Sequence, residues 1–300
     1  MKPVSHIKVD KNMKVDELVK AMSASGVMGA GSIGKAADIL EKMYKDKECK
    51  IFFGVAGAMV PGGMKNIIID MLNSSRISVF VTTGSNLTHD LVEALCESLY
   101  VGDENMDDAK LNKEGYVRMF NSLMKSNVYE KLEQFFEKNW QDIAKSKTIK
   151  EFLWNIGSKI ESNESILKVC NDKKIPIFCP GISDSGIGLM IWGRISQGKD
   201  KKINVDAFDD MKEIIDIAWT SKKSGVLYCG GGVPKNFIQQ SLQFSKGAQY
   251  GVQITTDHPE AGGSSGAPLK EGISWGKLNA GAEYADVICD ATIALPLIWA

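Results

Sequence analysis

Short apolar runs alternate with longer segments of helical spacing along most of this chain, and this alternation constrains the fold more than any other feature. The runs are rich in branched and aromatic residues and are apolar on both faces, which is typical of a parallel sheet covered on both sides. We expect strands at residues 50–55, 78–83, 175–179, 225–229, 249–255 and 285–289. Helical spacing predicts helices at 34–46, 62–74, 88–99, 205–220 and 234–245. The pattern therefore predicts an α/β, doubly wound fold with a mainly parallel, Rossmann-like sheet and helices on both faces.

Residues 103–170 interrupt this alternation. They are rich in Asp, Glu, Lys and Asn, and their apolar residues, among them Met119, Leu123 and Phe136, recur at helical intervals. We expect two or three helices that form an insertion rather than a separate domain. The 300 residues are then organised as an N-terminal arm at 1–14 and a single domain at 15–300.

Charge and cysteine usage exclude several classes of partner. The chain has 36 basic and 37 acidic residues, so its net charge of −1 gives no field that would attract nucleic acid or an anionic membrane. The six cysteines form no CxxC pair and lie far from histidines, which predicts reduced thiols and no metal site. No signal peptide and no run of about 18 apolar residues is present, so we expect a cytoplasmic protein.

Segments rich in small and polar residues follow five of the predicted strands. Ligands of α/β sheets bind beyond the carboxyl ends of the strands, so we expect these loops to form one site for a large ligand. Glycines in the loops would allow the backbone to approach that ligand closely. The loops are Gly57–Gly63, Thr82–Asp90, Pro180–Gly188, Gly230–Asn236 and Thr255–Gly266.

Two glycine motifs compete for a phosphate-binding role. Gly29, Gly31 and Gly34 match G-x-G-x-x-G, but the residues before them have a helical pattern, whereas the dinucleotide fingerprint follows a strand. We interpret that motif as a tightly packed structural turn. The run Gly230–Gly232 follows a predicted strand and precedes a helix that Pro234 opens, which indicates an anion site at a helix N-terminus. A tight turn that needs positive φ is the alternative for this second motif.

The stretch around Lys277 carries the strongest chemical signal. Lys277 follows Trp275 in a loop rich in glycine and serine, where Glu271 and Lys270 are nearly the only other charges. A lysine removed from water is left as a neutral amine, the form that attacks carbonyls and imines. Trp275 offers an aromatic face, and Glu271 a carboxylate, to a cationic amine. We expect a pocket for an amine with several positive charges, although a lone lysine is more often a solvated surface residue.

Five motifs resemble those of the deoxyhypusine synthase family. One is SWGK, preceded by GGSSGA and followed by CDATIALPLI. The others are VTTGSNLTHDLVEAL at 81–95, FGVAGAMVPGGM at 53–64, PIFCPGISDSGIG at 176–188 and CGGGVPKNFI at 229–238. They occur in order from about residue 15 to the end, and the HD pair and the GGGVPKN run resemble the archaeal branch of the family.

The resemblance implies a transferase that uses NAD and spermidine to modify the precursor of translation factor 5A. NAD would take a hydride from spermidine, 1,3-diaminopropane would leave, and Lys277 would hold the remaining aminobutyl group as an imine. The group would then pass to one lysine of the factor, and NADH would return the hydride to give deoxyhypusine. The family also implies a homotetramer with sites at a dimer interface.

The matched positions imply roles for individual residues. The implied amine-binding residues are Glu271, Trp275, Asn236, Gly262 and Ser264. The implied cofactor-binding residues are Gly57, Ala58, Met59, Val60, Pro61, Thr83, Gly84, Ser85, Asp184, Gly231, Thr256, Asp257, Asp290 and Ala291. Lys277 and His89 are the candidate catalytic residues. His89 and Asp90 would contact the nicotinamide ribose or help to move a proton, and a structural role for the histidine is the alternative.

Several positions depart from the family pattern. Where the eukaryotic pattern has carboxylates, this chain has His89, Leu189 and Ser264, and Asn236 replaces a histidine. Ala261 stands where the archaeal pattern has a tryptophan. The site is therefore short of carboxylates for a trication, which leaves open a homospermidine synthase that uses putrescine as acceptor. A silent relative that only binds NAD, or assembles with an active subunit, is the other alternative.

Overall fold

The computed structural model describes residues 1–95, 97–198 and 203–300, so Cys96 lies outside the described residues. The chain divides into two compact units. The first comprises Met1–Gly57, Arg76–Val81 and Met211–Ala300, and the second comprises Ala58–Ser75 and Thr82–Asp210. None of the helices described is long and apolar enough to cross a lipid bilayer.

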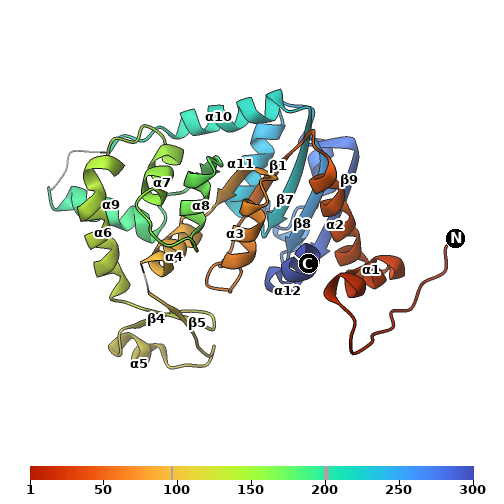
Figure 1. Cartoon of the computed structure of the whole chain (residues 1–300), viewed down its shortest axis with the longest axis horizontal. Helices are drawn as coiled ribbons and strands as arrows, with labels where there is room; N and C mark the ends of the chain where they lie inside the picture. The colour runs from red at the N-terminus through yellow and green to blue at the C-terminus, as the bar shows by residue number, and fades with distance from the viewer. Residues whose placement is uncertain (96, 199–202) are drawn as a thin grey trace. The chain divides into compact units, whose positions relative to one another are not determined.

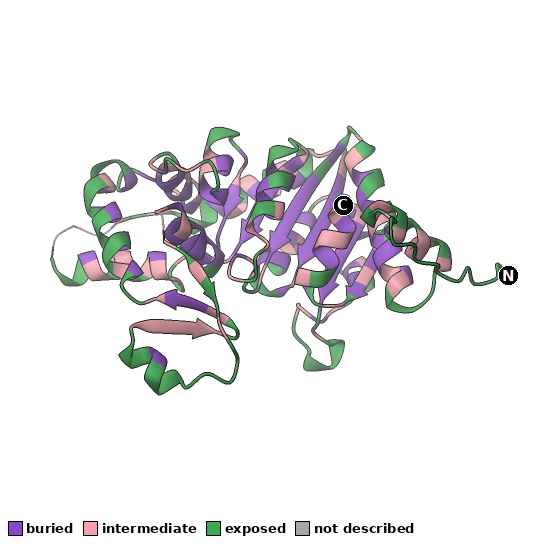
Figure 2. Ribbon diagram, turned by 60° about the horizontal axis from the view of Figure 1, so that its bottom comes forward, coloured by how far each residue is buried: buried purple, intermediate pink, exposed green. Residues whose placement is uncertain are grey.

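A six-stranded sheet has the strand order β6-β2-β1-β7-β8-β9 (Figure 1). The pairs β1–β7, β7–β8 and β8–β9 are parallel, as expected for a doubly wound α/β fold. Strands β1, β7 and β8 are largely buried, which explains why their sequences are apolar on both faces (Figure 2). The strands are β1 Cys49–Val55, β2 Ile77–Thr82, β6 Ile177–Phe178, β7 Lys223–Cys229, β8 Ala248–Thr255 and β9 Leu278–Ile288. The predicted fold class is confirmed.

The glycines of the G-x-G-x-x-G motif lie inside a helix of the first unit. Helix α1 (Val15–Ser25) precedes α2 (Met28–Lys45), so the motif has the helical context that the sequence predicts, but it forms no turn. A Cβ atom on Gly31 would lie 2.4 Å from the backbone of Gly26, and one on Gly34 would lie 2.3 Å from the backbone of Ser23. These glycines therefore let α1 and α2 pack closely.

Three further helices complete the first unit. They are α10 (Ala207–Thr220), whose first residues belong to the second unit, α11 (Gly232–Leu242) and α12 (Ala291–Trp299), with short 3-10 turns η1 (Pro259–Ala261) and η2 (Leu269–Ile273). Strand β9 begins at Leu278, seven residues before the expected start. Asn279, Ala280 and Gly281 are exposed there, so the start of the strand lacks the apolar pattern that marks the others.

The second unit is mainly helical. Its helices are α3 (Lys65–Asn73), α4 (Gly84–Ala94), α5 (Asp108–Lys113), α6 (Val128–Ile143), α7 (Ile149–Gly157), α8 (Ile166–Asp172) and α9 (Gly186–Ser196). The apolar stripe of α6 is buried through Leu132 and Phe136, and the Phe136 ring stacks on Phe152 of α7. Helix α4 ends at Ala94, so the expected helix to residue 99 is wrong at its end, and Leu99 begins a strand.

The second unit also contains a small sheet, and two of its three strands lie within residues 103–170, where only helices were predicted. Strands β3 (Leu99–Val101), β5 (Ser122–Lys125) and β4 (Tyr116–Met119) pair in that order and are antiparallel. Met119 pairs with Ser122, so the hairpin turns at Phe120 and Asn121, and Phe120 has a φ of 54°. The spacing of Met119 and Leu123 therefore matched a helix by coincidence, because a hairpin separates them.

Candidate active site

Lys277 lines a cavity of about 190 Å³ in the first unit. Five other residues for which the sequence predicts amine binding line the same cavity. The complete lining is Asn236, Gln239, Gly262, Gly263, Ser264, Ala267, Pro268, Glu271, Gly272, Trp275 and Lys277. Residues 41 positions apart in the sequence are thus brought to one pocket, and Gln239 is a polar member that the sequence motifs did not indicate.

Three elements position these side chains. Helix α11 supplies Asn236 and Gln239, the segment 262–272 supplies the middle of the lining, and Lys277 lies immediately before β9. The turn η2 brings the chain back on itself, so that the Lys277 amide donates to the Gly272 carbonyl at 2.8 Å. The Lys277 carbonyl accepts from the Ala248 amide at 3.1 Å, which ties the lysine to the first residue of β8. The backbone of Lys277 is therefore fixed on both sides.

The Lys277 amine lies against an aromatic ring. Its Nζ is 4.9 Å from the centroid of the Trp275 ring, and the lysine is half-buried. The tryptophan is 56% exposed, so its ring remains accessible to a second cation. Glu271 is the only carboxylate in the lining, and it is exposed. The pocket thus combines a primary amine, an aromatic face and one negative charge, a set suited to binding an amine and attacking an electrophilic carbon.

The loops after β7 and β8 meet at Gly231. A Cβ atom there would lie 2.2 Å from the Cα of Ser265, so no larger residue fits without a shift of the backbone. Ser264 Oγ donates to the Gly232 carbonyl at 3.2 Å. By contrast, nothing lies within 4 Å of a Cβ atom placed on Gly232 or Gly262, so the backbone at these two glycines faces open space. The glycine run therefore serves both close packing and an accessible helix N-terminus.

The other cofactor candidates of the first unit lie where strands end or helices begin. Gly57 follows β1 with a φ of 72°, and Thr256 is exposed directly after β8. The Asp257 carboxylate accepts hydrogen bonds from Ser265 Oγ and the His258 amide, and these bonds lower its pKa. Asp290 caps α12 by accepting from the Thr292 amide at 2.7 Å, and Ala291 is the first residue of that helix.

The remaining cofactor candidates belong to the second unit. Thr83 caps α4 through a 3.4 Å hydrogen bond from the Asn86 amide, and the Val60 amide donates to Asn86 Oδ1 at 3.2 Å. These contacts bring the 58–61 segment and the start of α4 together. Gly84 is required by sterics, because a Cβ atom there would lie 2.5 Å from that of Ser185. The other candidates in this unit are Ala58, Met59, Pro61, Ser85 and Asp184, of which Ala58, Ser85 and Asp184 are exposed.

His89 and Asp90 lie inside α4 in the second unit. His89 is 7% exposed, burial lowers its pKa, and its Nδ1 has no hydrogen-bond partner among the described residues. The Asp90 carboxylate accepts from Ser165 Oγ, the Ile166 amide and the Leu167 amide at 2.8 to 3.0 Å. Asp90 therefore caps the N-terminus of α8, a structural use that its sequence motif did not reveal.

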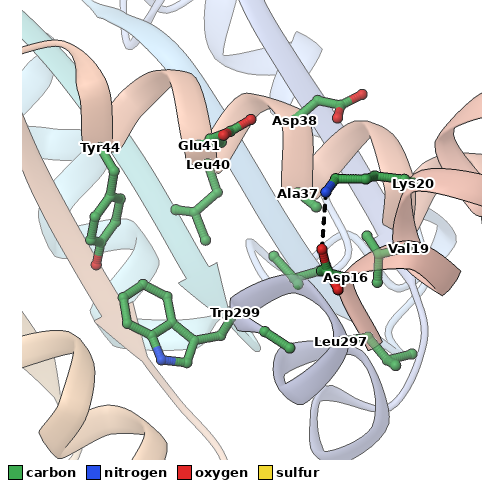
Figure 3. Close-up of a pocket in the computed structure, with 12 residues that line it drawn as sticks. Asp16, Val19, Lys20, Ala37, Asp38, Leu40, Glu41, Tyr44, Leu297 and Trp299 are labelled. Carbon is green, nitrogen blue, oxygen red and sulfur yellow. Dashed lines mark hydrogen bonds and ion pairs between the residues drawn. The ribbon is translucent and has the colours of Figure 1, made fainter. Parts of the chain in front are cut away.

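A larger cavity of about 310 Å³ lies between α1, α2 and the end of α12 (Figure 3). None of the predicted site residues lines it. Its carboxylates include Asp16, which pairs with Lys20 at 2.9 Å, and Glu41, which pairs with Lys45 at 2.6 Å on the same helix. These are exposed pairs of little energetic weight, so the cavity offers no chemistry comparable to the pocket of Lys277. Within the described residues, no group of three or more His, Cys, Asp or Glu side chains could hold a metal ion.

Comparison with known proteins finds matches over nearly the whole chain. The family model described as "Deoxyhypusine synthase" matches residues 17–300. The chain belongs to the deoxyhypusine synthase family. A "Probable deoxyhypusine synthase" from Methanosarcina thermophila is 40% identical over 298 residues, which cover 99% of this chain and 93% of the relative. "Probable deoxyhypusine synthase 1" from Archaeoglobus fulgidus is 38% identical over 299 residues, which cover 99% and 96%.

A solved structure supports the fold. The crystal structure of a protein assigned as a deoxyhypusine synthase from Entamoeba histolytica superposes with a TM-score of 0.65. The match covers 98% of this chain and 95% of the other at 19% sequence identity. Membership of the deoxyhypusine synthase family makes this protein an enzyme of the transferase class. The resemblance stated from the sequence motifs is therefore confirmed.

Proposed function

We propose that this protein transfers the 4-aminobutyl group of spermidine to one lysine of the translation factor 5A precursor, with NAD as its cofactor. The observation that carries the proposal is the pocket that joins Lys277 to Trp275 and Glu271. Family membership supports the general reaction. The electrophile, the acceptor and the cofactor are inferred from the chemistry that these residues can perform.

Lys277 acts as the nucleophile in this proposal. The lone pair of its Nζ attacks the oxidised carbon of the aminobutyl group, and the C=N bond from that carbon to the nitrogen of 1,3-diaminopropane is replaced by a C=N bond to Nζ. Over this exchange Nζ gives up two protons and the departing nitrogen gains two, so 1,3-diaminopropane leaves as a neutral amine and an imine remains on Lys277. The amine of the acceptor lysine then displaces Nζ in the same way. The two backbone hydrogen bonds of Lys277 fix the point from which its side chain reaches the substrate in both exchanges.

Trp275 and Glu271 bind the amine. The exposed ring of Trp275 attracts a cationic nitrogen, and the carboxylate of Glu271 offers it a charged hydrogen-bond acceptor. Neither side chain exchanges a proton with the reacting carbon. Loss of either side chain should therefore weaken spermidine binding more than it lowers the rate at which bound spermidine reacts.

The first unit has features that fit a dinucleotide. The open backbone at Gly232 suits a phosphate at a helix N-terminus, and the carboxylates of Asp257 and Asp290 suit ribose hydroxyls. NAD, when bound, supplies a hydride acceptor and later a hydride donor. For the second unit, the family resemblance leads us to propose cofactor-binding roles for Thr83 to Ser85 and Ala58 to Pro61, and a catalytic role for His89. We also propose that the protein forms a homotetramer. Light scattering after gel filtration measures its molar mass and tests this proposal.

Trapping with borohydride tests the role of Lys277. Wild-type protein with NAD and labelled spermidine should gain one reduced aminobutyl group on the Lys277 peptide. Lys277→Arg should lose the adduct and about 1,000-fold or more of the turnover, because a guanidinium stays protonated. Lys270→Arg, which changes an exposed lysine of the same loop, should keep both. An adduct on another residue, or none in the wild type, would overturn the proposal.

A second candidate is transfer to putrescine, giving homospermidine. It is favoured by the neutral lining at Asn236 and Ser264, which leaves Glu271 as the only carboxylate of the pocket. Labelled spermidine should be offered with the factor 5A precursor and, separately, with putrescine. Label in the protein acceptor supports the leading proposal, and label in homospermidine alone supports the second candidate.

A further inference from the structure

Lys235 is a buried lysine directly beneath the Lys277 pocket. It lies in the first turns of α11 and is only 1% exposed, although lysines almost always lie at the surface. Its Nζ donates to two backbone carbonyls, those of Ser264 and Ala267, each at 2.6 Å. Lys235 does not line the pocket, whereas both of its partners do.

The two carbonyls belong to the segment that forms the middle of the pocket lining. Gln253 Nε2 also donates to the Ala267 carbonyl, at 3.2 Å, so a buried strand residue supports the same point. Two residues later, the amide of Leu269 donates to the Asp286 carboxylate at 3.1 Å. The segment 264–269 is therefore held by a buried cation through its carbonyls and by a carboxylate through an amide.

Charges of both signs lie near Lys235. Burial lowers the pKa of Lys235 to about 8, the nearby carboxylates of Asp286 and Glu271 act in the opposite direction, and the charge of Lys277 adds to the lowering. Burial in turn raises the pKa of Asp286, which the Lys235 charge opposes. A buried cation without such partners would cost several kcal/mol.

We propose that Lys235 is a positioning residue: by holding the carbonyls of Ser264 and Ala267, it fixes the pocket wall that presents Ser264 and Glu271 to the amine substrate. This inference rests on the proposed function, because the pocket must bind an amine for its wall to matter. Lys235 touches no substrate in this account. Its removal should loosen one wall of the pocket and leave the nucleophile in place.

The test compares Lys235→Met with Lys246→Met, which changes an exposed position of the same unit. Lys235→Met keeps an unbranched side chain of similar length but removes the charge and the hydrogen-bond donors. Lys235→Met should weaken spermidine binding by about tenfold or more in calorimetry, because two carbonyls lose a charged donor. At saturating spermidine, the yield of the Lys277 adduct should stay within about twofold of the wild type. Lys246→Met should match the wild type in both measurements.

Hydrogen exchange separates positioning from general destabilisation. In Lys235→Met, amides of residues 262–272 should exchange faster, while those of β7 and α12 should keep their wild-type rates. Where Lys235→Met does not fold, Lys235→Gln keeps a shorter neutral donor and should show the same changes to a smaller extent. Unchanged spermidine affinity or unchanged exchange at 262–272 in a folded variant would overturn the inference. Absence of any adduct in the wild type would instead overturn the proposed function.

Discussion

The carboxylate of Asp90 is wholly buried and accepts three hydrogen bonds at the start of α8. Burial raises its pKa to about 6, and the hydrogen bonds from Leu167, Ile166 and Ser165 oppose that rise. In the unfolded chain the pKa returns towards 3.8. The folded state therefore holds this proton more tightly than the unfolded state does.

This difference predicts a pH dependence of stability. The protonated Asp90 carboxyl stabilises the folded state. This stabilisation is fully present below the unfolded pKa and is lost as pH rises through about 6. The stability of the wild type relative to Asp90→Asn should fall by up to about 3 kcal/mol between about pH 4 and pH 7. Urea unfolding at the two pH values measures it. Asp172→Asn, at the exposed end of α8, is the control, and an equal change in both variants would contradict the assignment to Asp90.

Lys277 and Lys235 show what a sequence can and cannot reveal at this scale. Lys277 could be singled out because its neighbours, a tryptophan, glycines and serines, are unusual around a surface lysine. Lys235 lies in the same GGGVPKN run that carries the family resemblance, but its burial depends on two carbonyls about 30 residues away. Nothing local to Lys235 predicts those partners.

At the scale of elements, the packing of α1 against α2 depends on glycines of the G-x-G-x-x-G motif. The motif itself suggests a phosphate-binding turn rather than helix packing. Gly34 lies where α2 approaches α1, whereas Gly29 lies at a point of α2 with no neighbour within 4 Å of a Cβ position. Glycine is therefore needed for close packing at position 34 and is not needed for packing at position 29 of the same helix.

Alanine substitutions should separate these two glycines. Gly34→Ala should lower the free energy of unfolding by about 1–3 kcal/mol, because the backbone of Ser23 must move. Gly29→Ala should raise it by about 0.5–1 kcal/mol, because alanine restricts the unfolded chain and favours the helix. Thermal and urea unfolding of both variants measure the signs. Two changes of the same sign would contradict this account of the packing.

Strands were predictable where they are nearly continuous apolar runs and were missed in the β4–β5 hairpin, although Leu123 and Met124 of β5 are buried. The core strands β1, β2, β7 and β8 are nearly continuous apolar runs, so their positions agree with the structure to within a few residues. The β4–β5 hairpin has Met119 and Leu123 at a helix-like interval and turns at Phe120 and Asn121, of which only the asparagine is a typical turn residue. Long-range pairing, rather than local pattern, decides its structure.

At the scale of the whole molecule, four of the six cysteines, Cys49, Cys170, Cys179 and Cys229, are buried in the core. Burial raises the pKa of the Cys49, Cys179 and Cys229 thiols to about 12, so almost no reactive thiolate forms at neutral pH. These four thiols are free as well as buried in the structure. Cys289 is half-buried.

Thiol labelling should therefore report on the integrity of the core. In the native protein, peptides containing these four cysteines should react with a water-soluble maleimide about a hundredfold or more slowly than in the denatured chain. Mass spectrometry of the digested protein measures each site separately, with the guanidinium-unfolded chain as control. Rapid native labelling of Cys179 or Cys229 would contradict the burial described.

Lys235 donates its hydrogen bonds to main-chain oxygens, so these bonds do not depend on which side chains the wall of the Lys277 pocket carries. The side chains of that wall can therefore differ while its main chain stays in position. Substitutions of Ala261 and Gly263 leave the carbonyls of Ser264 and Ala267 available to Lys235, whereas Gly262 has a φ of 72° that a larger residue would strain. A library confined to positions 261 and 263 is thus a rational route to altered polyamine preference. By the same route, substrate preference can change in evolution through side-chain substitutions while the main chain of the pocket is kept.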